Sequence, residues 1–199
     1  MTIAESASTE ELLLDAARAC ILAVGWRRST LTEIARRAGV SRMTVYRSWP
    51  DMQALFADLM TREWRRVDTE VAARAGDARP DRGDYPERLA GLLVLMVRRL
   101  RRDPLFRRII ELDPELLLPY LLSRRGRSQQ LMLDRLEAAV AAGVAAGTIR
   151  PVDPVHAARA LVLTAHGFVL SPQTMRDRSC SLAALETEFA ETVRRYLEP

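Results

Sequence analysis

Apolar side chains recur at three- and four-residue intervals along most of the chain, which is the period of an amphipathic α-helix. The first such stripe consists of Leu13, Ala17, Cys20 and Val24. It follows Ser8-Thr9-Glu10-Glu11, a capping-box signature in which a serine precedes a glutamate by three positions. We therefore expect a first helix that begins after Ser8 and ends at Gly25, with disorder in the seven residues at the start of the chain. No segment shows the two-residue alternation of a strand, so the pattern predicts an all-α fold.

Capping residues, glycines and prolines mark where the later helices begin and end. Thr30 and Glu33 form a second capping box, which opens a helix that stops at Gly39. Ser41 caps a third helix, and Pro50 ends it. Further helices are predicted over 52–74, 86–102, 128–146, 154–170 and 182–197, with short ones after Asp103-Pro104 and Asp113-Pro114 and a Gly/Asp/Pro-rich loop over 75–85. We therefore predict two domains, a three-helix head over 1–50 and a larger helical body over 51–199.

Residues 30–50 meet the requirements of a helix-turn-helix unit. Such a unit needs a small residue where its second helix crosses the first closely, and Ala35 supplies it. It also needs a residue that tolerates positive φ in the tight turn, and Gly39 supplies that. The apolar residues that lock the two helices together are Ile34, Val40 and Val45. All of these requirements are met at the required spacing.

The helix after Ser41 has one side that is unsuited to a protein core. At about 100° per residue, Val45, Ser48 and Trp49 fall on one side, whereas Met43, Tyr46 and Arg47 fall on the other, flanked by Arg42 and Thr44. Arginine can pair with guanine O6 and N7, threonine can contact a base edge or a thymine methyl, and tyrosine can reach a phosphate. A solvated helix face explains a pair of arginines, but it does not explain the turn, the cap and the outward aromatic ring together. We interpret this helix as one that enters the major groove of DNA.

Charge is distributed in a way that agrees with this interpretation. The formal net charge is only +4, and every one of the 30 basic residues is arginine. Between Gly25 and Pro50, however, there are six arginines and a single acidic residue, Glu33. A local basic patch on a nearly balanced chain is the electrostatic signature expected of a DNA-binding module.

Several other classes of protein lack support in the sequence. Cys20 and Cys180 match no metal or redox spacing, and no apolar stretch reaches the roughly 20 residues of a membrane helix, so we expect a reduced cytoplasmic protein without a membrane partner. His156 and His166 cannot share a metal ion ten residues apart on one helix, and a core or pocket role is the favoured interpretation. No nucleophile elbow, phosphate loop or paired-carboxylate motif occurs, so we predict no enzyme, no cofactor and no metal.

The motif in this segment resembles the signature of the tetracycline-repressor (TetR) family. The matching run is Thr32-x-Ile34-Ala35-x-x-Ala38-Gly39-Val40-Ser41-x-x-Thr44-x-Tyr46-x-x-Trp49-Pro50, within a resemblance that covers residues 9 to 56. Trp49 stands where the family usually has phenylalanine. Met52 stands where many members carry a phosphate-contacting lysine. The resemblance implies DNA contacts by Thr32, Arg42, Met43, Thr44, Tyr46 and Arg47, with Ser41 as a helix cap, a phosphate contact or both.

The resemblance also implies a helical body that binds a small molecule and dimerises through its last two helices. The apolar stripe Leu182, Leu185, Phe189, Val193 and Tyr196, with small residues at Ala157, Ala158, Ala160, Ala165 and Gly167, suits a four-helix interface between subunits, although both stripes could instead close the core of one chain. The candidate pocket residues are Trp64, Met96, Phe106, Tyr120, His166 and Phe168, and a plain core role fits them equally well. We expect a homodimeric repressor that binds a palindromic operator in double-stranded DNA and is released by a small, mostly apolar effector. The alternative is a constitutive DNA-binding protein or an activator without a ligand.

Overall fold

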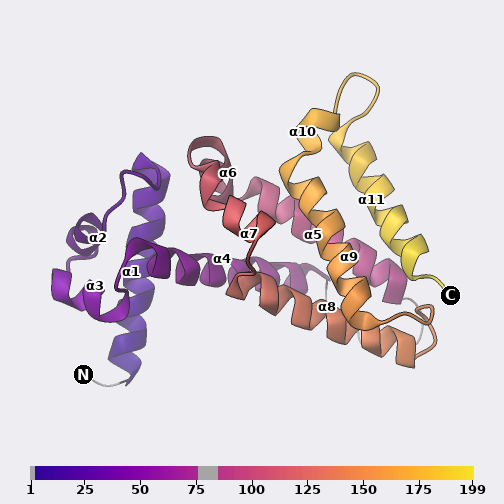
Figure 1. Ribbon diagram of the computed structural model, residues 1–199, viewed down its shortest axis with the longest axis horizontal. Helices are drawn as coiled ribbons and strands as arrows, with labels where there is room; N and C mark the ends of the chain where they lie inside the picture. The colour runs from indigo at the N-terminus through magenta and orange to yellow at the C-terminus, as the bar shows by residue number, and fades with distance from the viewer. Residues whose placement is uncertain (1–2, 76–84) are drawn as a thin grey trace. The chain divides into compact units, whose positions relative to one another are not determined.

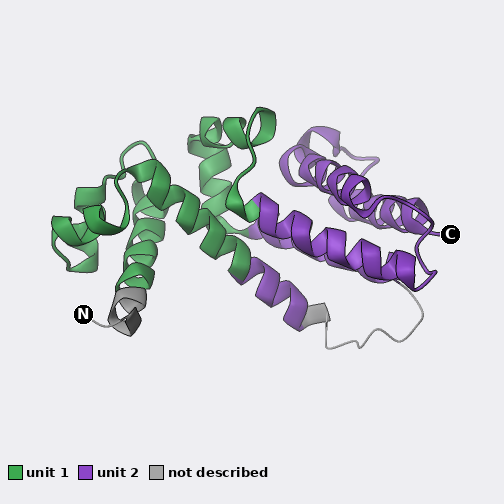
Figure 2. Cartoon of the chain, turned by 60° about the horizontal axis from the view of Figure 1, so that its bottom comes forward, with its two compact units in different colours: residues 1–65, 103–128 green, residues 66–102, 129–199 purple. Residues whose placement is uncertain are grey.

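The computed structural model describes residues 3–75 and 85–199, with side chains from residue 9 onward except at positions 74 and 75. Within these ranges the chain forms helices and no strand (Figure 1), which confirms the predicted all-α fold. The predicted loop over 75–85 lies almost entirely outside the described residues. The described helices fall into two compact units (Figure 2), residues 1–65 with 103–128 and residues 66–102 with 129–199, which we call unit 1 and unit 2.

Unit 1 contains the predicted helix-turn-helix. Its elements are α1 (Ile3–Val24), α2 (Leu31–Ala38), α3 (Arg42–Ser48), the first part of α4 (Met52–Ala75), α6 (Pro104–Leu112), the 3-10 turn η1 (Pro114–Leu116) and α7 (Leu118–Leu122). One core joins them, with Leu13, Ile21, Ile34, Val45, Leu55, Leu59, Leu105 and Ile109 almost fully buried. Because burying one such side chain contributes about 1.5–3 kcal/mol, this core accounts for much of the stability of the unit.

The compact unit around the helix-turn-helix is larger than the segment 1–50. Leu55 and Leu59 of α4 and Leu105 and Ile109 of α6 pack into the same core as α1, α2 and α3. The functional boundary at Pro50–Asp51 stays a prediction, but the packing that supports the head extends well beyond it. Asp51 does cap α4, since its Oδ1 accepts a hydrogen bond from the Ala54 N–H at 2.8 Å.

The first helix begins earlier than the capping signature predicts. α1 starts at Ile3, so Ser8 lies inside the helix and the expected disorder before it is wrong as far as residues 3–7 are described. The segment from Ile3 to Ala7 contains no glycine or proline, and its alanines and glutamate favour helix. A helix with such residues ahead of a capping signature continues through it.

Unit 2 is a helical bundle. It contains the second part of α4, α5 (Tyr85–Arg102), most of α8 (Arg127–Ala145), α9 (Pro154–Leu170), the short α10 (Pro172–Met175) and α11 (Leu182–Leu197). α5 and α11 run antiparallel, because Glu186 near the start of α11 pairs with Arg98 and Arg101, whereas Arg194 near its end lies close to Glu87. None of the described helices combines the length and apolar character that a membrane crossing requires.

The inward face of α11 matches the predicted stripe only in part, whereas on α9 three of the predicted small residues, Ala157, Ala158 and Ala165, face inward. On α11 the buried residues are Glu186, Phe189, Val193 and Leu197, whereas Leu182, Leu185 and Tyr196 are only partly buried. On α9 they are Ala157, Ala158, Leu161, Val162, Ala165 and Val169. Much of both predicted stripes therefore closes the core of a single chain. The side of α9 that remains exposed is marked by Leu163, whose exposed fraction is 70%.

Candidate nucleic-acid interface

A tight turn joins α2 to α3. Gly39 has a φ of +69°, in the left-handed region, and its N–H bonds to the carbonyl groups of Ala35 and Arg36. The Val40 N–H donates to the Ala35 oxygen at 3.0 Å. A Cβ added at Gly39 would meet no atom within 4 Å, so the requirement for glycine is conformational rather than steric. This is the role that the sequence predicts for Gly39.

The N-terminus of α2 is capped by half of the predicted capping box. The Thr30 hydroxyl accepts a hydrogen bond from the Glu33 N–H at 3.2 Å, as expected. The Glu33 carboxylate, however, accepts two hydrogen bonds from the Arg36 guanidinium, at 2.8 and 2.6 Å. Hydrogen bonding to Arg36 lowers the pKa of Glu33 and raises the pKa of Arg36. Glu33 therefore neutralises one arginine of the basic patch.

α3 presents the two faces that its sequence predicts. Val45 is fully buried and Trp49, which follows the last helical residue, is 3% exposed. On the other side Met43 is 77% exposed and Tyr46 is 49% exposed. Met43 and Tyr46 are thus among the large side chains that the fold leaves exposed. They form an outward face available to a partner.

The predicted DNA-contacting residues gather at this face. Ser41 caps α3, since its hydroxyl accepts from the Thr44 N–H at 3.1 Å and lies 2.9 Å from the Thr44 hydroxyl. Arg42, Met43, Tyr46 and Arg47 are exposed, and Thr44 is partly exposed. Thr32 is on α2, also partly exposed. Ser41 is thus assigned its capping role, and the DNA contacts of the set remain predictions.

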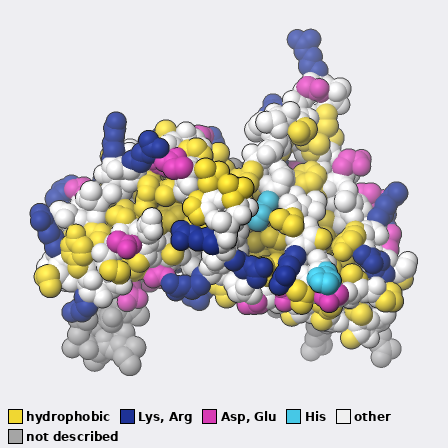
Figure 3. All heavy atoms as spheres, in the orientation of Figure 1, with side chains coloured by type: hydrophobic (Ala, Val, Ile, Leu, Met, Phe, Trp, Pro, Cys, Tyr) yellow, Lys and Arg dark blue, Asp and Glu magenta, His cyan; other side chains and the backbone are white. Residues whose placement is uncertain are grey.

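The arginines of the basic patch are not equally available. Arg27 pairs with Glu115 at 2.6 Å and Arg36 pairs with Glu33, so both are partly neutralised. Within the described part of the chain, Arg28, Arg37 and Arg42 are exposed and make no ion pair. Figure 3 shows arginine side chains on the surface in the region of α2 and α3. Arg28 and Arg37 are not among the predicted DNA-contacting residues, although both lie in the arginine-rich segment between Gly25 and Pro50.

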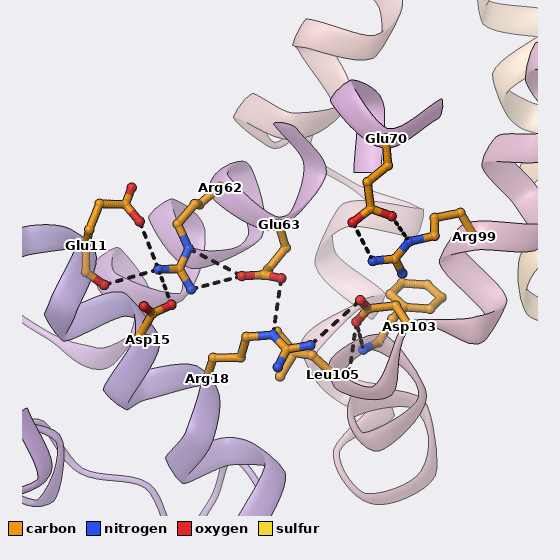
Figure 4. Close-up of polar contacts among 10 residues, drawn as sticks. Glu11, Asp15, Arg18, Arg62, Glu63, Glu70, Arg99, Asp103 and Leu105 are labelled. Carbon is orange, nitrogen blue, oxygen red and sulfur yellow. Dashed lines mark hydrogen bonds and ion pairs between the residues drawn. The ribbon is translucent and has the colours of Figure 1, made fainter. Parts of the chain in front are cut away.

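A buried ionic network supports the helix-turn-helix from α1 and α4 (Figure 4). Arg62 of α4 is 8% exposed and contacts Glu63, Asp15 and Glu11 at 2.9, 2.9 and 3.1 Å. Glu63 also accepts from Arg18 of α1 at 3.2 Å. Two sets of contacts join α1 to α4, the shielded Arg18–Glu63 pair and the pairs of Arg62 with the more exposed Glu11 and Asp15. No sequence motif marks this network, because its contacts join residues as many as 51 positions apart.

α6 is attached at both ends to the helix-turn-helix side of unit 1. At its start, Asp103 caps the helix through the Leu105 and Phe106 N–H groups and lies 3.9 Å from Arg18. After its end, the buried Asp113 accepts from the Trp26 N–H at 2.8 Å, in the loop that precedes α2. In the sequence the two Asp-Pro pairs only mark helix boundaries. In the structure Asp103 also anchors α6 to α1, and Asp113 anchors it to the loop between α1 and α2.

The predicted pocket residues are divided between the two units. Trp64, Phe106 and Tyr120 belong to unit 1, and Met96, His166 and Phe168 belong to unit 2. Phe168 stacks on Phe189 with ring centroids 4.4 Å apart, and burial lowers the pKa of His166. Among the described residues no three His, Cys, Asp or Glu side chains converge to hold a metal ion. The pocket assignment remains a prediction.

The glycine turn, the capped and outward-facing α3 and the exposed arginines define a helix-turn-helix unit of the kind found in DNA-binding proteins. Residues 13–59 match the model of the bacterial regulatory proteins of the tetR family. The chain is 35% identical over 193 residues to an uncharacterized HTH-type transcriptional regulator of Mycobacterium bovis, covering 97% of this chain and 96% of that one. The chain belongs to the tetR family, whose members are regulators rather than enzymes. This confirms the predicted family and the prediction that the protein is not an enzyme.

Two solved structures share the fold over most of their length. SmeT, the repressor of the Stenotrophomonas maltophilia multidrug efflux pump SmeDEF, is 27% identical with a TM-score of 0.61, covering 96% of this chain and 90% of that one. The transcriptional regulator FadR from Bacillus subtilis, solved in complex with stearoyl-CoA, is 18% identical with a TM-score of 0.63, covering 94% of this chain and 99% of that one. The likeness to FadR concerns the fold alone.

Proposed function

We propose that this TetR-family regulator is a repressor that binds a palindromic operator as a homodimer and leaves it when a small, mostly apolar effector binds. The observation that carries the proposal is the outward face of α3, with Met43 and Tyr46 exposed beside Arg42 and Arg47. Double-stranded DNA suits that face because its major groove admits a helix and presents guanine and thymine edges to arginine and threonine. A repressor role is supported by the likeness to SmeT.

The DNA contacts are tested by removing them one at a time. Replacing Arg42 or Arg47 by alanine should cost about 1–3 kcal/mol of operator binding and relax specificity at one position in each half-site. Tyr46→Phe should weaken binding evenly across sequences if the hydroxyl only holds a phosphate. Arg107→Ala serves as the control, because Arg107 is an exposed arginine on α6. Unchanged affinity in the Arg42→Ala and Arg47→Ala double variant would show that α3 is not the reading helix.

The operator itself is found by selecting bound DNA from a random pool. A two-fold dimer places two recognition helices in successive major grooves, roughly 34–36 Å apart or a multiple of that, so the selected sequences should be palindromic. They are then compared with the sequence upstream of the protein's own gene. We infer that the protein works in the cytoplasm, because the DNA of a bacterium lies there. Selected sequences without symmetry would contradict the dimeric reading mode.

The exposed face of α9 is the best candidate for the dimer interface. Ala160, Leu163 and Gly167 lie on it at intervals of three and four residues, and all three are exposed. A Cβ at Gly167 would meet no atom within 4 Å, which leaves room for a partner helix to approach. Ala165 faces the core of its own chain, so a charge there would disrupt folding rather than assembly. The informative variant is Leu163→Glu.

Leu163→Glu should give folded monomers with greatly weakened operator binding. Light scattering measures the molar mass, circular dichroism the helix content, and a DNA-binding assay the operator affinity. The matched control is Ala141→Glu, an exposed position on α8 of the same unit. A wild-type protein that is monomeric at micromolar concentration would overturn the dimer. So would a Leu163→Glu variant that dimerises as well as the control.

The effector is the third part of the proposal. Support comes from the likeness in fold to FadR, which was solved in complex with stearoyl-CoA. A ligand that binds only the folded protein raises its melting temperature, so a thermal-shift screen of apolar compounds should find it. Conversion from mostly bound to mostly free repressor requires a preference of several kcal/mol for the released state. If every compound that raises the melting temperature leaves operator affinity unchanged, the alternative holds, namely a constitutive DNA-binding protein or an activator.

A further inference from the structure

One carboxylate joins the end of the recognition helix to two other helices. The Nε1–H of Trp49, the C-cap residue of α3, donates to Asp58 Oδ2 on α4 at 2.9 Å. The other oxygen, Asp58 Oδ1, lies 3.0 Å from Nη1 of Arg127, the first residue of α8. All three residues belong to unit 1. Each oxygen of Asp58 therefore has its own partner.

The hydrogen bond to Asp58 meets a requirement that a phenylalanine at position 49 would not create. A buried indole N–H needs an acceptor, because an unsatisfied donor in the core is costly. The Trp49 ring is 3% exposed and its Nε1–H is directed at Asp58, whose side chain is 35% exposed. The ring therefore has one preferred orientation in the core, fixed by a charge-assisted bond as well as by packing.

That orientation bears on the DNA-reading face. α3 is a helix of only seven residues, too short to be stable by itself. Its last turn is closed by the Trp49 N–H, which donates to the Val45 oxygen at 2.9 Å. Tyr46 and Arg47 lie in this turn with exposed side chains. A shift of the Trp49 ring would therefore move the residues that face outward.

We propose that Asp58 is a positioning residue that holds the C-terminal end of the recognition helix through Trp49, and that Arg127 orients the Asp58 carboxylate. Asp58 itself touches no DNA. Its effect on operator binding rests on the proposed function, whereas its effect on the order of α3 does not. Arg127 is 71% exposed, so its ion pair is screened by water and its influence is the smaller of the two.

Four variants separate the two bonds. Trp49→Phe keeps a ring and removes the donor, and Asp58→Leu removes the acceptor at similar size. Asp58→Asn keeps an oxygen that can accept from Trp49 but loses the charge that attracts Arg127, and Arg127→Gln loses the opposite charge. The control is Arg107→Gln, since Arg107 forms an exposed pair with Glu111 on α6. Every variant is made in the full chain.

The first measurement is amide hydrogen exchange in the DNA-free protein. Trp49→Phe and Asp58→Leu should speed exchange at residues 46–49 by about three- to tenfold relative to α2, which is the size expected from one lost hydrogen bond. Asp58→Asn and Arg127→Gln should have smaller effects, and Arg127→Gln should add nothing in the Asp58→Asn background. If the Trp49→Phe variant exchanges its amide hydrogens at residues 46–49 at the wild-type rate, the proposal is overturned. Equal acceleration in α1, α2 and α3 would also overturn it, because that indicates general destabilisation.

The second measurement is the ratio of operator affinity to affinity for random-sequence DNA. Trp49→Phe and Asp58→Leu should reduce this ratio by about three- to tenfold, whereas a merely structural loss would lower both affinities together. An unchanged ratio in a folded Trp49→Phe variant would overturn the positioning role in DNA binding. If the wild-type chain selects no DNA sequence, the proposed function fails, and the exchange measurement still decides whether Asp58 orders α3.

Discussion

Replacing Arg62 by methionine removes the cation at the centre of the network that joins α1 to α4. Arg62 contacts three carboxylates, but they do not contribute equally. The side chains of Glu11 and Asp15 are each 59% exposed, so their ion pairs with Arg62 are screened and contribute little. The side chain of Glu63 is only 10% exposed, and the substitution takes the Arg62 guanidinium away from it.

The expected loss follows from what remains beside Glu63. Breaking a fully buried pair costs about 3–5 kcal/mol, because the remaining charge is desolvated and unpaired. Here Arg18 still donates to Glu63 at 3.2 Å, so we expect Arg62→Met to lower the free energy of unfolding by about 2–3 kcal/mol. At roughly 2–4 °C per kcal/mol for a chain of this size, the melting temperature should fall by about 4–12 °C.

The assay is urea and thermal unfolding followed by circular dichroism at one fixed protein concentration. The control is Arg107→Met, which breaks an exposed pair with Glu111 and should cost about 1 kcal/mol or less. The Arg18→Met and Arg62→Met double variant leaves Glu63 without either arginine, so its loss should exceed the sum of the single losses. A single-variant loss no larger than that of the control, or a double variant that is simply additive, would refute the reasoning.

Three further predictions concern unit 2. Gly143→Ala places a Cβ 2.4 Å from Ile149 Cδ1 and should lower the free energy of unfolding by about 1–3 kcal/mol. The added Cβ of Gly91→Ala meets nothing within 4 Å, so this variant should stabilise α5. Urea unfolding that shows the two variants equally stable would contradict this prediction. Hydrogen bonds from Arg194 and then Arg195 lower the pKa of Glu191 from 4.5 to about 2, so its stabilisation is present above pH 4.5 and is lost as the pH falls towards 2. Glu191→Gln should therefore flatten the acid limb of stability over that window, and an unchanged limb would count against the pairing. Burial lowers the pKa of His166 below 6.5, so protonation of this side chain opposes folding. The stability of the protein should therefore decline as the pH falls below 6.5. An NMR titration of His166 with a midpoint at or above 6.5 would be the contrary result.

The sequence by itself determined the helices and the turn of the head. Thr30, Gly39, Ser41 and Pro50 act within a few residues of their own position, through caps, a left-handed φ and a missing N–H. Such local interactions can be read from spacing, and the predicted faces of α3 follow from its period alone. The family signature lies in the same segment, because the residues that make it up act locally.

Tertiary structure alone decided how distant residues are used. Arg62 contacts Glu11, which is 51 residues away, and Asp113 accepts from the Trp26 N–H, which is 87 residues away. No local pattern predicts either contact. Glu186 faces inward on α11 because two arginines of α5 neutralise it there, whereas its charge alone predicts an exposed position. The assignment of Ala165 to the core and of Leu163 to the surface likewise depends on which sides of α9 its neighbours cover. An apolar helix can be recognised from its residues, but the face that stays open for a partner is set by the elements packed against it.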